Sequence, residues 1–133
     1  QGKKNIDLIR MDIEGFEVEV FEGMLPAIDK NSSFRPSILF ETHRAMYKEP
    51  DRSLKKMLNQ LFDRGYYTEA LISNEYSWAR FGEFGLQPDV TMPSDGLTRG
   101  LYYNMKNEDV IKFSCEIGCV RGLLLKYNSK YLD

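Results

Sequence analysis

Two short apolar runs that end in charged residues constrain the fold of this chain more than any other feature. The first run, residues 6–11, leads directly into Asp12-Ile13-Glu14-Gly15, and the second, Ser37–Glu41, ends two residues before His43. A segment with helical spacing separates them, which predicts parallel strands joined by a right-handed crossover. Ligands bind beyond the carboxyl ends of such strands. We therefore expect four polar side chains to converge on one rim of the sheet: Asp12, Glu14, Glu41 and His43.

The first run and the segment after it predict a buried strand and a broken helix. Apolar residues do not alternate cleanly in residues 6–11, so we expect this strand to be buried on both faces. A helix should begin at Glu14 or Gly15. Its apolar stripe is expected to consist of Phe16, Val20, Met24 and Ile28. Gly23 and Pro26 are expected to divide the segment into two short helices, because proline is tolerated only in a first turn.

Further along the chain, the pattern predicts a second strong helix and a long loop. Residues 53–64 have the apolar spacing of an amphipathic helix, with Gly65 placed to end it. Other elements are expected as a connector at residues 47–51, strands at residues 66–72 and 100–105, and helices at residues 107–116 and 121–127. Residues 74–99 are rich in glycine and proline and lack a sustained period, which predicts a long loop. Its aromatic residues could line an acceptor pocket, but we expect them to attach the loop to the core: Tyr76, Trp78, Phe81 and Phe84.

Together these elements predict a single α/β domain across residues 1–133. We expect three layers around a mixed sheet, with two or three parallel strands and a C-terminal antiparallel hairpin.

Composition excludes several classes of partner. The formal net charge is −2 with interspersed acids and bases, so neither nucleic acid nor a membrane surface is expected as a partner. No apolar run reaches the roughly 18 residues of a membrane span. Two cysteines, Cys115 and Cys119, are too few for a disulfide framework, which favours a reducing, cytoplasmic location. Because the chain begins at Gln1 rather than methionine, we expect it to be part of a longer protein.

The stretch IDLIRMDIEGFEVEVFEGM, followed by RPSILFETH, resembles the FkbM family of S-adenosylmethionine-dependent methyltransferases. The pattern of that family is an apolar strand ending in Asp-x-Glu-Gly, a helix rich in Glu and Val that ends in Gly, and a strand ending in Glu shortly before His. The matching positions here are Asp12, Glu14, Gly15, Glu17, Val20, Gly23, Glu41 and His43. Arg10 stands where the family usually has lysine.

The resemblance implies a Rossmann-like class I methyltransferase fold, of which this chain would be the C-terminal half. Such enzymes transfer a methyl group from S-adenosylmethionine to a hydroxyl, often on a sugar or another natural product. The resemblance implies catalytic roles for Asp12, Glu41 and His43, and cofactor contacts from Asp12 and Glu14. The Gly-rich cofactor turn of the fold has no counterpart in this sequence. We therefore expect the cofactor to act in the intact parent protein, and the isolated chain to bind it weakly and to be inactive.

The missing half also predicts association. In the parent fold, the strand at residues 6–11 would lie mid-sheet, beside a strand that this chain lacks. An exposed apolar strand edge recruits other chains. We therefore expect a homo-oligomer formed through this edge or the adjoining sheet face, or a piece of a larger chain.

Alternative roles remain open for the site residues. Glu14 could cap the helix and Asp12 could hold the turn, both by accepting backbone hydrogen bonds. A divalent metal at Asp12, Glu41 and His43 is geometrically conceivable, but no spacing motif requires one and none is expected. The whole chain could instead be a non-catalytic interaction or structural domain derived from a methyltransferase half-fold.

Overall fold

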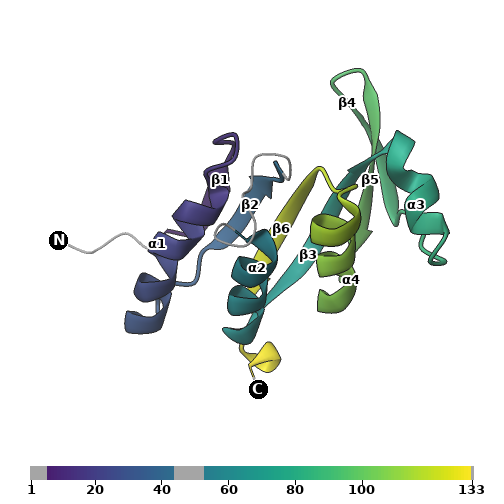
Figure 1. The fold of residues 1–133 in the computed structure, drawn as a ribbon. Helices are drawn as coiled ribbons and strands as arrows, with labels where there is room; N and C mark the ends of the chain where they lie inside the picture. The colour runs from purple at the N-terminus through teal and green to yellow at the C-terminus, as the bar shows by residue number, and fades with distance from the viewer. Residues whose placement is uncertain (1–5, 44–52, 133) are drawn as a thin grey trace.

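The computed structural model describes residues 6–43 and 53–132, which form a six-stranded sheet covered by helices (Figure 1). The strands are β1 (Leu8–Met11), β2 (Ser37–Glu41), β3 (Tyr66–Asn74), β4 (Val90–Ser94), β5 (Leu97–Tyr103) and β6 (Gly122–Tyr127). The helices are α1 (Glu17–Lys30), α2 (Leu54–Asp63), α3 (Trp78–Gly82) and α4 (Asn107–Ile111). The expected connector at residues 47–51 lies outside the described residues.

The sheet is mixed, as the sequence predicts. Its strand order is β1-β2-β6-β3-β5-β4. β1 and β2 pair in parallel, with Leu8 opposite Ser37 and Met11 opposite Phe40. Every other neighbouring pair is antiparallel, so β6 runs against both β2 and β3 and separates them. The strands at residues 66–72 and 100–105 are antiparallel neighbours, but the hairpin itself is β4–β5, and the last strand lies inside the sheet.

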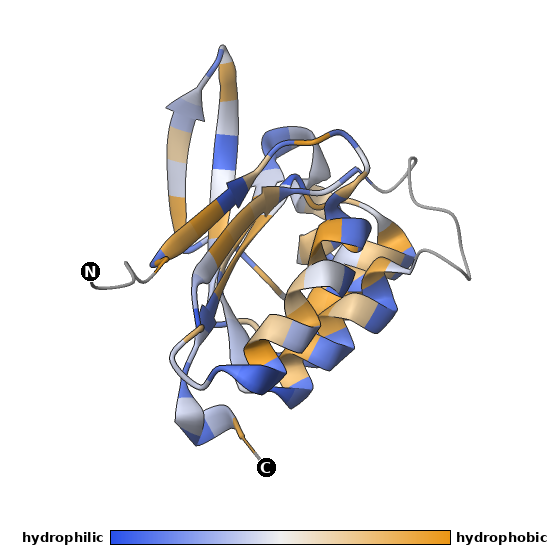
Figure 2. Cartoon of the chain, turned by 90° about the vertical axis from the view of Figure 1, so that its left-hand side faces the viewer, coloured by the Kyte–Doolittle hydropathy of each residue, from blue (hydrophilic) through white to orange (hydrophobic). Residues whose placement is uncertain are grey.

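Helices α1, α2 and α4 cover one face of the sheet, and the core lies between them and the strands (Figure 2). The strand residues that face these helices are at most 2% exposed: Ile38, Phe40, Leu71, Tyr102, Leu123 and Leu125. Phe21 of α1 meets Phe40 edge to face, with ring centroids 5.0 Å apart. Each such side chain contributes about 1.5–3 kcal/mol when fully buried. Among the described residues the arrangement is therefore two-layered, whereas three layers were expected.

Helix α2 and strand β2 form where the sequence predicts them. Ser53 caps α2 by accepting a hydrogen bond from the Lys56 backbone N–H at 3.1 Å. The apolar residues that give this helix its spacing are all buried: Leu54, Met57, Leu58, Leu61 and Phe62. Gly65 follows with φ of +91°, and a Cβ atom there would lie 2.8 Å from the Tyr127 ring. Glycine is thus required at this turn for both its conformation and its size.

Helix α1 is continuous, so the expected division at Gly23 and Pro26 is wrong. Pro26 cannot donate to the carbonyl of Glu22, but both residues are exposed, so water can satisfy that carbonyl. The predicted stripe also needs correction. Phe16 precedes the helix and is 61% exposed, whereas Glu17 is fully buried.

Strand β1 is not buried on both faces as expected. It is an edge strand, and Leu8 on the face away from the helices is 54% exposed. Only Met11 is fully enclosed by the core. An apolar run without clean alternation is therefore found at a sheet edge here, although it indicates a central strand in the sequence.

The expected long loop at residues 74–99 is mostly ordered structure. It contains a 3₁₀ turn at Glu75–Ser77, helix α3, strand β4 and the start of β5. Trp78 packs so closely on Gly100 of β5 that a Cβ atom there would lie 2.6 Å from its indole nitrogen. The aromatic Phe81 stacks on Tyr102 at 4.3 Å, so these rings attach the segment to the core.

Residues 121–127, expected to form a helix, are strand β6. Leu123 and Leu125 face the helices and Leu124 faces the other side, which is the alternation of a strand. A run of three leucines fits a helix and a strand equally well. The helix expected at residues 107–116 is present as α4, which continues into a π-helical turn at Lys112–Ile117.

Candidate active site at the ends of two parallel strands

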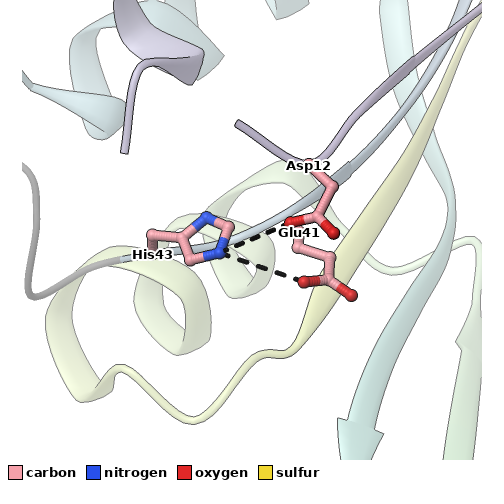
Figure 3. Close-up of side chains that lie close together, drawn as sticks. All are labelled: Asp12, Glu41 and His43. Atoms are coloured by element: carbon pink, nitrogen blue, oxygen red, sulfur yellow. Dashed lines mark ion pairs between the residues drawn. The ribbon is translucent and has the colours of Figure 1, made fainter. Parts of the chain in front are cut away.

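Three side chains point toward one another beyond the carboxyl ends of β1 and β2 (Figure 3). Asp12 follows β1, Glu41 ends β2, and His43 lies two residues further on. The His43 Nε2 atom is 3.8 Å from Asp12 Oδ1 and 3.9 Å from Glu41 Oε2. The parallel register of β1 and β2 brings these positions to the same rim of the sheet. We refer to Asp12, Glu41 and His43 as the rim cluster.

A fourth side chain, Glu17, orients the imidazole. Its Oε1 atom lies 2.7 Å from His43 Nδ1, and its other oxygen accepts a hydrogen bond from the Gly15 backbone N–H at 3.0 Å. Glu17 is fully buried, so this carboxylate is held in one place. Because an ionised carboxylate only accepts, Nδ1 carries a hydrogen and Nε2 faces the other two acids.

The turn between β1 and α1 brings Glu17 into position. Glu14 and Gly15 both have positive φ values, +50° and +103°. This conformation is uncommon for glutamate but free of cost for glycine. After this turn, Glu17 in the first turn of α1 lies beside His43.

Arg121 holds the opposite side of the cluster. Its guanidinium donates to Glu41 Oε1 at 3.1 Å, which leaves Oε2 directed at His43. Its backbone is fixed as well, because the Thr42 N–H donates to the Arg121 carbonyl at 3.0 Å. The residue before β6 thus stabilises the end of β2.

A cavity of about 290 Å³ adjoins the cluster and shares Glu41 with it. Leu39 and Ile72 alternate with the helix-facing Phe40 and Leu71, so the cavity lies on the other face of the sheet, where Met92 and Ser94 of the β4–β5 hairpin also line it. Apolar side chains from β2, β3 and β5 line it: Leu39, Ile72 and Leu101. Three arginines also line it: Arg10, Arg99 and Arg121. An apolar wall with a few charged groups is typical of a small-molecule site.

A sequence model described as the methyltransferase FkbM domain matches residues 1–67. The chain belongs to the FkbM methyltransferase family. The match includes β1, α1, β2 and every member of the rim cluster. Neither the curated proteins nor the solved structures contain a match to the chain.

The structure brings together three of the four side chains that the sequence predicts at this rim. Asp12, Glu41 and His43 each present a ligand-type atom, and these atoms all lie within 4.8 Å of one another. Glu14 is exposed in the neighbouring turn and is not part of the cluster. The catalytic and cofactor-binding roles of these residues in the FkbM domain stay predictions.

Two residues of the site escaped the sequence analysis. Glu17 shares the helical spacing of Phe21, Met24 and Ile28, so its burial could have been inferred from the stripe. A buried acid on such a stripe indicates a specific partner. Arg121 carries no local signal, because its pairing with Glu41 depends on the long-range pairing of β6 with β2.

The two cysteines have a structural explanation. Cys115 and Cys119 are half-buried and are not joined by a disulfide. Burial raises the pKa of the Cys119 thiol above its usual range, so its reactive thiolate is disfavoured.

Within residues 6–43 and 53–132, none of the helices has the length and apolar character needed to cross a bilayer.

Proposed function

We propose that this FkbM-family chain serves S-adenosylmethionine-dependent methylation of a hydroxyl group, on a sugar or another natural product. The observation that carries the proposal is the convergence of Asp12, Glu41 and His43 at the carboxyl ends of two parallel strands. The family match to residues 1–67 supports it.

When bound, S-adenosylmethionine supplies an activated methyl group on a sulfonium. The residues suited to contact it are Asp12 and Glu14, both exposed carboxylates in the turn after β1. Carboxylates accept hydrogen bonds from hydroxyl and ammonium groups, which this cofactor carries. We therefore assign these two side chains to the cofactor contact.

The rim cluster orients the acceptor and takes up its proton. The acceptor oxygen gains the methyl carbon as the carbon–sulfur bond breaks, and its hydroxyl proton passes to the cluster. His43 Nε2 is the best oriented proton acceptor, since Glu17 holds the ring through Nδ1. General-base assistance of this kind contributes about 10²–10⁴-fold to a rate. The adjoining cavity would hold the body of the acceptor against Leu39, Ile72 and Leu101.

The test is methyl transfer from radiolabelled S-adenosylmethionine to a panel of hydroxylated acceptors, using the full-length gene product. Asp12→Asn should lower turnover at least about tenfold while the fold is retained. Asp7→Asn is the matched control, because it removes the same charge from an exposed position before β1. Absence of transfer to every acceptor, together with absence of cofactor binding, would refute the proposed function.

A second candidate function is a non-catalytic interaction domain. The observation that favours it is the row of exposed apolar side chains on the β4–β5 hairpin, Val90, Met92 and Leu97. An apolar surface of this kind marks a contact site for another protein. Turnover that depends on Asp12 but not on Leu97, an exposed hairpin residue outside the cavity lining, would decide in favour of the enzyme.

A further inference from the structure

The three side chains of the rim cluster converge as the ligands of one ion would. Asp12 Oδ1 comes from the end of β1, and Glu41 Oε2 and His43 Nε2 come from the end of β2; these atoms lie within 4.8 Å of one another. We propose that Asp12, Glu41 and His43 bind a divalent metal cation that accepts both carboxylate oxygen and imidazole nitrogen, of the Mn²⁺ type. This binding stands on the geometry of the chain and does not depend on methyl transfer. A bound cation occupies the Nε2 lone pair, so His43 takes up the acceptor proton only while the cation is absent.

The distances between the ligand atoms fit a shared cation. Carboxylate oxygens and imidazole nitrogens bind such ions at about 2.0–2.2 Å, which places two ligand atoms of one ion roughly 3–4 Å apart. The measured separations of 3.8 and 3.9 Å fall within this range. They exceed the 2.7–3.2 Å of a direct hydrogen bond between nitrogen and oxygen. Hydrogen bonds between the ring and these two acids therefore do not explain the approach, and an ion pair would require a protonated imidazole.

Glu17 provides the outer support that a metal-binding histidine needs. Such a histidine almost always donates its second ring N–H to a carboxylate or carbonyl, which fixes the ring and directs the other nitrogen at the metal. Here the buried Glu17 carboxylate lies 2.7 Å from Nδ1. The atom left facing Asp12 and Glu41 is Nε2 (Figure 3).

Glu41 has corresponding support. Its Oε1 atom accepts from the Arg121 guanidinium at 3.1 Å, while Oε2 is the oxygen directed at His43. Ligating carboxylates in metal sites are commonly hydrogen-bonded in this way. Two of the three ligands are thus held by side chains that do not themselves reach the cation.

The charge and exposure of the site select the kind of cation. Two carboxylates and a neutral imidazole give a net charge of −2, which matches a divalent ion. Imidazole favours transition-series ions over Mg²⁺ and Ca²⁺, whereas the two oxygens keep Mn²⁺ suitable. Asp12 is 46% exposed and Glu41 31%, so solvent reaches the site. Among residues 6–43 and 53–132 three ligands are present, and a three-ligand site leaves positions open for water or for an acceptor oxygen.

The first experiment measures Mn²⁺ binding to the chain by calorimetry and electron paramagnetic resonance. We expect one site, weakened at least about tenfold by Asp12→Asn, Glu41→Gln or His43→Gln, which corresponds to about 1.4 kcal/mol. Asp7→Asn and Glu22→Gln are charge-matched controls at exposed positions and should bind as the wild type does. Mn²⁺ binding that survives all three ligand substitutions would overturn the proposal.

The second experiment needs no variant at the ligands and so is not affected by misfolding. His43 is the single histidine of the chain, so its imidazole resonances are assigned without ambiguity. Substoichiometric Mn²⁺ should broaden these resonances first, and Zn²⁺ should shift the Nε2 resonance rather than that of Nδ1. Glu17→Gln should weaken binding about 10–100-fold although every ligand is retained. Unchanged imidazole resonances at saturating Mn²⁺ would overturn the site whether or not methyl transfer is observed.

Discussion

Replacing Glu17 with glutamine tests how the chain sets the orientation and protonation of His43. The two side chains have the same shape, but glutamine has one acceptor and one donor where glutamate has two acceptors. The Gly15 backbone N–H can only donate, so the glutamine oxygen must face it. The amide NH₂ then faces Nδ1 of His43, which must become an acceptor. We therefore expect the ring proton to move to Nε2, the atom that faces Asp12 and Glu41.

The expected cost in stability is small for glutamine and larger for leucine. Glu17→Gln retains a hydrogen bond on both sides, so the free energy of unfolding should change by less than about 1 kcal/mol. Glu17→Leu removes the acceptor of the Gly15 N–H and the partner of His43. A buried group that loses its partner costs about 1–3 kcal/mol, partly offset because a buried carboxylate is no longer desolvated. Glu22→Gln, exposed on the same helix, should change stability by less than about 0.5 kcal/mol.

Two measurements check this prediction. Denaturant titration gives the three unfolding free energies, and nitrogen-15 resonances of the single histidine report which ring nitrogen carries the proton. Turnover and Mn²⁺ affinity should both fall in Glu17→Gln, although its stability is nearly that of the wild type. A Glu17→Gln variant whose ring proton remains on Nδ1, or a Glu17→Leu variant as stable as the wild type, would show that Glu17 does not position the ring.

Three further outcomes are expected from the fold. Gly100→Ala should lower the free energy of unfolding by about 1–3 kcal/mol through overpacking, because the new Cβ atom would meet the indole of Trp78. The fluorescence emission of this single tryptophan should shift as well. Unchanged emission and stability would contradict the packing. Burial raises the pKa values of Tyr66 and Tyr102 to about 12, while unfolded tyrosines ionise near pH 10. The contribution of these two tyrosines to the free energy of unfolding should therefore be fully present below about pH 10 and be lost as the pH rises toward 12. An unfolding free energy that stays constant over this range in denaturant titrations would refute this. Self-association is expected through β1, and light scattering should show a lower mass for Leu8→Lys than for the wild type; a wild-type monomer at every concentration would exclude it.

The local spacing of apolar residues predicts an element correctly when that element has a single apolar face turned toward the core. Helix α2 has one continuous apolar stripe, a Ser cap and a terminal Gly, and each signal points to the same boundaries. Strand β6 was mistaken for a helix because three successive leucines fit both periods, and only its place between β2 and β3 decides. Strand β1 was expected to be buried because sequence pattern does not distinguish a central strand from an apolar edge strand.

For the candidate site too, local sequence signals predict some residues, whereas others depend on long-range pairing. Asp12, Glu41 and His43 could be predicted because each follows a strand, and parallel strands end at a common rim. Arg121 could not, since a contact between residues 80 positions apart depends on how the last strand inserts. Glu17 lies between these cases: its stripe indicated burial, but its partner required the three-dimensional fold.

The position of β6 also sets the order in which the molecule can assemble during synthesis. β2 and β3 are not paired with each other, and β6 joins them, although it is the last of the described strands to leave the ribosome. Without β6, the remaining pairings divide into β1 with β2 and a separate group of β3, β5 and β4. Contacts so distant in sequence form slowly and leave strand edges exposed to chaperones in the meantime. The strand end that carries Glu41 is fixed by Arg121, directly before β6, so the nascent chain completes the rim cluster only as β6 enters the sheet.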